Sequence, residues 1–153
     1  MLTQPNQLTK SLYDTDYHLW VLETLKKLEN KDFESLDLEN LIEEVSDLSR
    51  RQKKKLKNLL RNLFEHLLKL KYWQAEHNNN FRHWQGEITN FRKQIKDELE
   101  DSPSLTSYLL EVLDKCYQDG REIAAMRSGL SVEIFPEKAI ANLEQILDEN
   151  WLP

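Results

Sequence analysis

The 153-residue sequence is poor in cysteine, glycine and proline, with one, three and four residues. The single cysteine, Cys116, excludes an intramolecular disulfide and a zinc site built on several thiolates. So few glycines and prolines argue against a turn-rich β protein and against a low-complexity chain. No apolar run approaches the roughly 20 residues of a membrane span, and the N-terminus lacks the apolar core of a signal peptide. We therefore expect a reduced, cytoplasmic helical protein that does not enter a membrane.

Charge is distributed unevenly along the chain. Residues 1–49 carry a net charge of −7, residues 50–71 carry +8 and residues 72–153 carry −7. One interpretation is that the basic middle pairs with the acidic ends, inside one fold or across a dimer. The other is that the basic segment binds an anionic partner.

Apolar residues recur at three- and four-residue spacing, which predicts amphipathic helices in an all-α bundle. Residues 1–11 are polar and predict a flexible tail, and residues 12–153 predict a single helical domain. We expect four main helices and a short C-terminal one, over about residues 14–29, 38–74, 81–100, 103–128 and from 143 onward. In the first of these, Tyr17, Trp20, Val21, Leu25 and Leu28 form the predicted buried face.

The second predicted helix is unusually long and contains neither proline nor glycine. Its apolar arc holds Leu38, Leu41, Ile42, Val45 and Leu48, and continues after a polar interval through Leu56, Leu59, Leu60, Leu63, Leu67 and Leu70. At about 1.5 Å per residue it would be roughly 55 Å long. We expect either one continuous helix whose middle crosses solvent or a bend near residues 49–52.

Several residues mark predicted helix ends. Ser102 and Pro103 are suited to begin a helix, and Gly129 is suited to end it in the left-handed conformation. Asn142 and Gln145 predict a capping box for the last helix.

The order of these segments resembles one family. LYDTDYHLW, LDLENLIEEVSDL, LRNLFEHLLKLKYW, DSPSL, FPE and LEQILDENW together are similar to the family called domain of unknown function 29. The resemblance extends from about Leu12 to Pro153. It implies an all-helical fold and a cyanobacterial source, and it implies no activity.

Arg61 and His66 have an Arg-x4-His spacing, which is similar to that of metal-independent ribonucleases of the HEPN class. Such a pair could act by general acid–base catalysis and stabilise charge on a phosphate. The alternative is structural: His66 is a hydrogen-bonded histidine at the edge of the core, and Arg61 pairs with Glu65.

Four carboxylates, Glu39, Glu43, Glu44 and Asp47, cluster near the start of the long helix. The Glu-x-x-His motifs of di-metal bundles are missing, so we predict no metal site and no cofactor. We expect instead a buried polar cluster that includes Glu43, His66, Lys69 and Arg92.

Residues 50–57, called the basic stretch below, hold six cations: Arg50, Arg51, Lys53, Lys54, Lys55 and Lys57. They are the predicted binding surface, although no aromatic residues interleave them to stack on bases. We interpret the protein as a non-catalytic helical interaction module that binds a protein partner or itself. The alternative is an RNA-binding or ribonuclease-like protein that uses Arg61 and His66.

Overall fold

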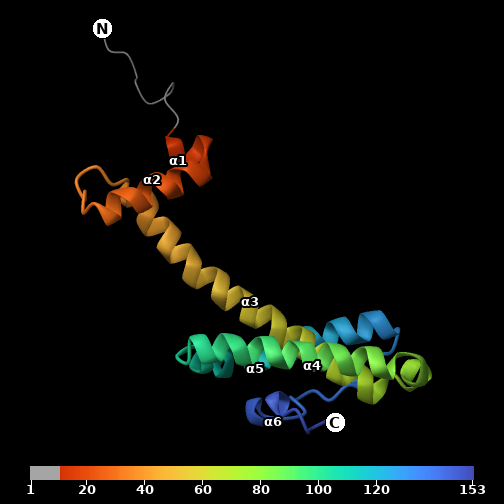
Figure 1. Cartoon of the computed structure of the whole chain (residues 1–153). Coiled ribbons are helices and arrows are strands. Elements are labelled where there is room, and N and C mark those ends of the chain that lie inside the picture. Colours follow the sequence, from red (N-terminus) through yellow and green to blue (C-terminus); the bar gives the residue numbers. More distant parts are fainter. Residues whose placement is uncertain (1–10) are drawn as a thin grey trace. The chain divides into compact units, whose positions relative to one another are not determined.

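The computed structural model describes residues 11–153, and all of their regular secondary structure is helical, with no strand. The predicted all-α class is therefore confirmed. The predicted flexible tail lies outside the described residues, except for Ser11. The elements, labelled in Figure 1, are α1 (Leu12–Thr15), α2 (Tyr17–Glu29), α3 (Leu38–Tyr72), the 3-10 turn η2 (Gln74–Glu76), α4 (His77–Asp101), α5 (Leu105–Ser128), the 3-10 turn η3 (Val132–Ile134) and α6 (Leu143–Leu147).

The chain divides into two compact units, and the boundary lies between Arg50 and Arg51. It falls inside α3, which is a single α-helix of 35 residues. The interval that the sequence offered as a possible bend, residues 49–52, is helical and coincides with this boundary. A single domain over residues 12–153 stays a prediction.

The start of the first unit differs from the expected helix over 14–29. Ser11 caps the short helix α1, and Asp16 then leaves helical geometry with φ −149° and ψ 86°. The Asp16 carboxylate accepts a hydrogen bond from the Leu19 backbone N–H at 3.0 Å and so caps α2. Each cap accepts a hydrogen bond from a free backbone N–H at the start of its own helix. The chain therefore forms two successive helices here instead of one.

Tyrosine hydroxyl groups tie α1 and α2 to α3 within the first unit. Tyr13 and Tyr17 each donate a hydrogen bond to the Glu44 carboxylate, at 2.5 and 2.6 Å. The bond to Glu44 raises the pKa of Tyr13 to about 12. The Trp20 ring packs edge-on against Tyr13. At the start of α3, the Asp37 carboxylate accepts a hydrogen bond from the Asn40 backbone N–H and so caps the helix.

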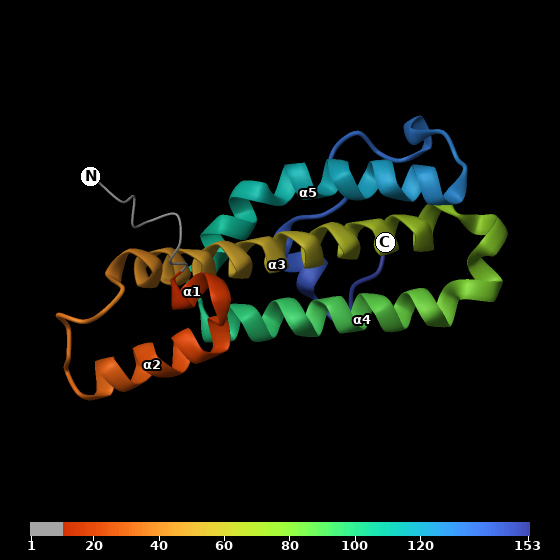
Figure 2. The ribbon, with the colours of Figure 1, turned by 90° about the horizontal axis from the view of Figure 1, so that it is seen from above.

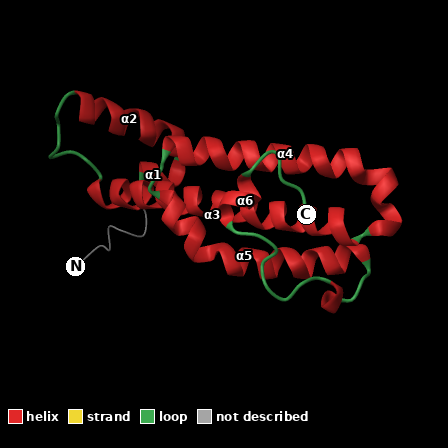
Figure 3. Ribbon diagram, turned by 90° about the horizontal axis from the view of Figure 1, so that it is seen from below, coloured by secondary structure: helices red, strands yellow, loops and turns green. Residues whose placement is uncertain are grey.

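The second unit is a helical bundle in which the second half of α3 lies between α4 and α5 (Figures 2 and 3). Six side chains of α3 at its centre are fully buried: Leu56, Leu60, Leu63, Phe64, Leu67 and Leu68. Phe64 meets Tyr117 of α5 edge-on at 5.2 Å between ring centroids. Trp73 stacks on Trp84 of α4 at 5.5 Å.

Two predicted helix starts in the second unit need correction. Helix α4 begins at His77 rather than Phe81, because the asparagines continue the helix and the Asn80 side chain donates to the Glu76 carbonyl one turn back. Helix α5 begins at Leu105, and the Ser102 hydroxyl accepts a hydrogen bond from Gln52 instead of capping the helix.

Two predicted helix ends are confirmed. Gly129 ends α5 with φ 73°. Asn142 and Gln145 form the capping box of α6, each side chain accepting from the backbone N–H of the other residue.

Candidate functional site

A buried ion cluster lies inside the second unit and consists of Glu65, Lys69 and Arg127. One Glu65 carboxylate oxygen is 3.0 Å from Lys69 Nζ and 2.8 Å from Arg127 Nη1. The Glu65 side chain is 2% exposed and that of Arg127 is 59% exposed, so Arg127 reaches the buried carboxylate from the surface. The Lys69 ammonium also lies 5.7 Å from the centre of the Trp84 ring. The cluster neutralises one buried carboxylate with two cations and pins α5 to α3.

This cluster differs from the predicted buried polar group. His66, Lys69 and Arg92 are buried, but Glu43 is not, because its side chain is 60% exposed and pairs with Arg50 on the same helix. The buried carboxylate is Glu65 instead. Its i,i+4 spacing from Lys69 resembles an ordinary surface pair, and Arg127 follows 62 residues later, so the sequence signal for this cluster was weak.

His66 lies at the edge of the core, in surroundings that favour its neutral form. It is 9% exposed, and its Nδ1 lies 2.9 Å from the Asn62 carbonyl oxygen, to which it donates. Its ring meets Phe91 of α4 edge-on at 5.1 Å. Burial, reinforced by the charge of Lys69, lowers the pKa of His66.

Arg61 faces a different neighbour. Its guanidinium donates to the Asn58 side chain on its own helix at 2.9 Å. Its charge acts on the thiol of Cys116 in α5, where burial is the larger effect and raises the thiol pKa to about 11. Arg61 therefore lies on the α5 side of α3, while His66 lies on the α4 side. This chain does not bring the two side chains of the Arg-x4-His pair together.

Arg92 is a structural clamp rather than part of the ion cluster. Its Nε donates to the Ile146 carbonyl and its Nη2 to the Trp151 carbonyl, both at 2.7 Å. These bonds hold the C-terminal segment against α4, where Trp151 packs beside the core. A guanidinium suits this task because its donors are fixed in one plane.

The basic stretch is largely engaged within the chain. Arg50 pairs with Asp47 at 2.6 Å, and Lys55 pairs with Glu98 at 2.5 Å. Lys53 lies over the Tyr108 ring at 5.3 Å from its centre, and Lys57 is half-buried. Arg51 and Lys54 are exposed.

The most prominent surface feature is an apolar stripe on the first half of α3, defined as Leu38, Ile42, Val45 and Leu48. These side chains are 58–62% exposed. Later residues on the same arc, Leu56, Leu59, Leu60 and Leu63, are 0–8% exposed. The arc that periodicity identified is therefore exposed along the first half of α3 and buried along the second half.

Helix α2 also exposes apolar side chains. Of the five residues predicted to be buried there, Trp20 is buried, and the other four are exposed: Tyr17, Val21, Leu25 and Leu28. The tyrosine–Glu44 bonds join α1 and α2 to α3, and Trp20 packs on Tyr13 between α1 and α2. None of these contacts uses the exposed aliphatic side chains. The first unit thus exposes aliphatic side chains on two helices.

The same unit is strongly acidic. Residues 11–50 carry eleven Asp or Glu side chains against four Lys or Arg, a net charge of −7. Arg50 is already paired with Glu43 and Asp47. Lys27 donates to the Ser35 carbonyl at 2.9 Å, which ties it to the loop before α3.

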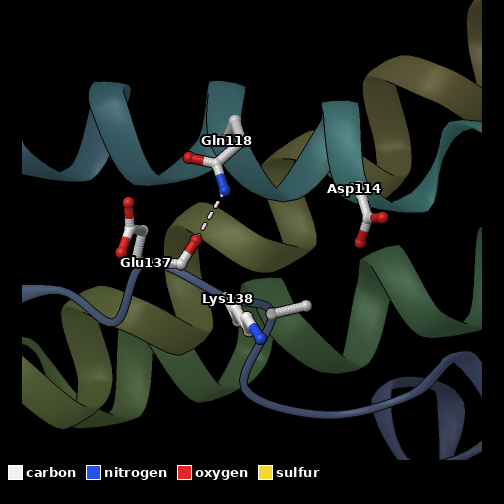
Figure 4. A pocket seen from close by; sticks show the side chains of 5 residues that line it. Asp114, Gln118, Glu137 and Lys138 are labelled. Atoms are coloured by element: carbon white, nitrogen blue, oxygen red, sulfur yellow. Dashed lines mark hydrogen bonds between the residues drawn. The ribbon is translucent and has the colours of Figure 1, made fainter.

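One open pocket lies against α5, between that helix and the segment at 137–139 (Figure 4). Its volume is about 450 Å³, and its walls are Asp114, Gln118, Glu137, Lys138 and Ala139. Gln118 donates to the Glu137 carbonyl at 2.7 Å and so anchors the segment to the helix. The mixture of charges in the pocket defines no single ligand chemistry.

Cys116 does not line this pocket. Its thiol is buried and its pKa is raised, which makes it a poor nucleophile.

Within residues 11–153, no three His, Cys, Asp or Glu side chains come together as a possible metal site. No helix over the same residues is long and apolar enough to span a membrane.

The fold and the surface together define an all-helical protein whose first unit is acidic and exposes aliphatic side chains. The family model described as domain of unknown function DUF29 matches residues 12–152, and the chain belongs to this family. Comparison with curated proteins and with solved structures gives no match.

Proposed function

We propose that the protein is a non-catalytic helical interaction module of the cytoplasm, and that its first unit binds another protein through the apolar stripe. The observation that carries the proposal is the contrast within α3. One arc of one helix is buried at Leu56 to Leu63 and 58–62% exposed at Leu38 to Leu48. Burying a side chain of this kind is worth roughly 1.5–3 kcal/mol, so four of them offer a partner substantial binding energy.

The second unit serves as the scaffold in this proposal. Its ion cluster and its aromatic pairs between α3, α4 and α5 stabilise the half of α3 that is buried. A reduced compartment suits the chain, because its one cysteine is buried in the α3–α5 interface and forms no disulfide.

The test uses a designed neutral helix that carries one stripe of leucines on a background of alanine and glutamine. We expect it to bind the wild-type protein and to bind the double variant Ile42→Gln, Val45→Gln about tenfold or more weakly, because buried aliphatic anchors dominate helix-in-groove binding. The matched control is Leu110→Gln, Met126→Gln, which removes two exposed apolar side chains of α5. Equal loss in both variants, or no binding to the wild type, would contradict the proposal.

A further inference from the structure

We propose that the partner of the apolar stripe is a basic amphipathic helix, with one aliphatic stripe flanked by lysine and arginine. This inference rests on the proposed function and adds the chemistry of the partner. It is carried by the coincidence of two features in one unit: exposed aliphatic side chains on α2 and α3, and a net charge of −7 over residues 11–50.

Electrostatics alone would favour any cation, and hydrophobicity alone would favour any apolar helix. Exposed carboxylates occur on both helices that expose aliphatic side chains, with Glu23 on α2 and Glu39 on α3. A helix that places leucines on the stripe brings its flanking side chains within about 10 Å of α3 carboxylates such as Glu39, which is one Debye length at about 0.1 M salt. Flanking cations are therefore attracted and flanking acids are repelled.

A second copy of the same surface is a poor occupant. When the stripes of two copies face each other, in either helix direction, two units of charge −7 are brought together. That repulsion opposes the apolar gain, because the two charged surfaces lie within a Debye length of each other.

The basic stretch of a second copy does not solve this problem. Its cations lie on α3, but the apolar arc beside them continues through Leu56 and Leu59, which are buried in the core of their own unit. Gln52 donates to Ser102 and Lys55 pairs with Glu98, so the ends of α4 and α5 already occupy this side of the helix. Helix α2 of a second copy exposes aliphatic side chains beside Lys26 and Lys27, but Glu23 and Glu29 balance these cations, so the helix has no net positive charge from its Lys, Asp and Glu residues. A different, more basic chain is therefore the better partner.

The experiment compares three peptides that share one leucine stripe and differ only in the flanking residues, which are lysine, glutamine or glutamate. Binding is measured by isothermal titration with the full chain. We expect the lysine-flanked peptide to bind at least about tenfold more tightly than the glutamine-flanked one at about 0.05 M salt. The difference should shrink at about 0.5 M salt, where charge is screened within a few ångströms.

A matched pair of variants locates the charge effect. Glu23→Gln, Glu39→Gln removes two exposed carboxylates of the first unit, and Glu111→Gln, Glu122→Gln removes two from the exposed face of α5. Both change the net charge equally. We expect only the first to weaken the lysine-flanked peptide several-fold at low salt, and neither to change binding of the glutamine-flanked peptide.

The outcomes separate the two proposals. If all three peptides bind equally well, or if both charge variants act alike, the basic partner is wrong and the interaction module stands. If no peptide binds to the wild type, the proposed function fails. If the wild type forms a dimer that Ile42→Gln, Val45→Gln dissociates in sedimentation measurements, the occupant is a second copy and the inference is overturned.

Discussion

At the scale of single residues, the second unit depends on one buried carboxylate. Glu65 accepts from Lys69 and Arg127 through the same oxygen, and Lys69 is itself buried. Glu65→Gln leaves the Lys69 cation buried without its counter-charge, which should cost about 3–5 kcal/mol in the free energy of unfolding. Urea denaturation measures this loss.

Arg127→Gln is the control for that prediction. Its side chain is mostly exposed, and Glu65 keeps Lys69 as a partner, so the expected loss is only about 1–2 kcal/mol. If Arg127→Gln were as destabilising as Glu65→Gln, the cost of the Glu65 substitution would not come from the buried Lys69 cation, and this prediction would be wrong.

His66 should make stability depend on pH. Its pKa is lowered in the folded state by burial and by Lys69, so the folded protein favours the neutral ring. The unfolded chain binds the proton more readily, with a pKa of about 6.5. The contribution of His66 is therefore complete above that pH, falls as the pH drops below it, and levels off below the folded-state pKa.

We expect His66→Gln to lose less stability than the wild type between about pH 7 and pH 5, with His83→Gln as an exposed control. Thermal unfolding over this range gives the comparison. Parallel curves for wild type and His66→Gln would contradict a buried neutral histidine.

At the scale of helices, α3 and α5 approach closely at Gly120. A Cβ there would lie 2.9 Å from the Arg61 carbonyl oxygen and 3.0 Å from both the Glu65 nitrogen and Phe64 Cβ. Gly120→Ala should destabilise by about 1–3 kcal/mol, although alanine is the better helix former. Gly86→Ala on α4 meets nothing within 4 Å and should stabilise by about 0.5–1 kcal/mol. If the denaturant midpoint shifted from the wild-type value in the same direction for both variants, this account of the α3–α5 contact would be wrong.

The two halves of the α3 arc allow one substitution to be compared at two places. Leu63→Ala removes a fully buried side chain and should cost about 2–5 kcal/mol. Leu48→Ala removes a side chain that is mostly exposed and should change stability by less than about 0.5 kcal/mol. Comparable losses would mean that the apolar stripe is covered in the folded monomer.

Much of the helical fold could be predicted because its signals are local. The capping box of Asn142 and Gln145, the end of α5 at Gly129 and the length of α3 each depend on neighbouring residues and on 3.6-residue periodicity. Leu38 to Leu48 show the limit, since periodicity identifies an apolar face but contains no information on what covers it. Glu65 and Arg127 show a second limit, because a partner 62 residues away leaves no local pattern.

At the scale of the whole chain, charge and hydrophobicity are divided between two units that share one helix. The second unit buries its aliphatic arc between α4 and α5 and has internal partners for several cations of the basic stretch. The first unit keeps its arc exposed and its surface acidic. Because of this division, we propose the apolar stripe of the first unit as the binding surface, whereas the sequence alone favoured the basic stretch.

The most direct test of this account is a methyl NMR titration of the full chain with the lysine-flanked peptide. Ile42 and Val45 report on the apolar stripe, whereas Ile88 and Ile95 lie in the buried core of the second unit. The account predicts that the methyl signals of Ile42 and Val45 shift on binding and that those of Ile88 and Ile95 stay in place. Shifts confined to the second unit, or no shift at Ile42 and Val45 at saturating peptide, would contradict it.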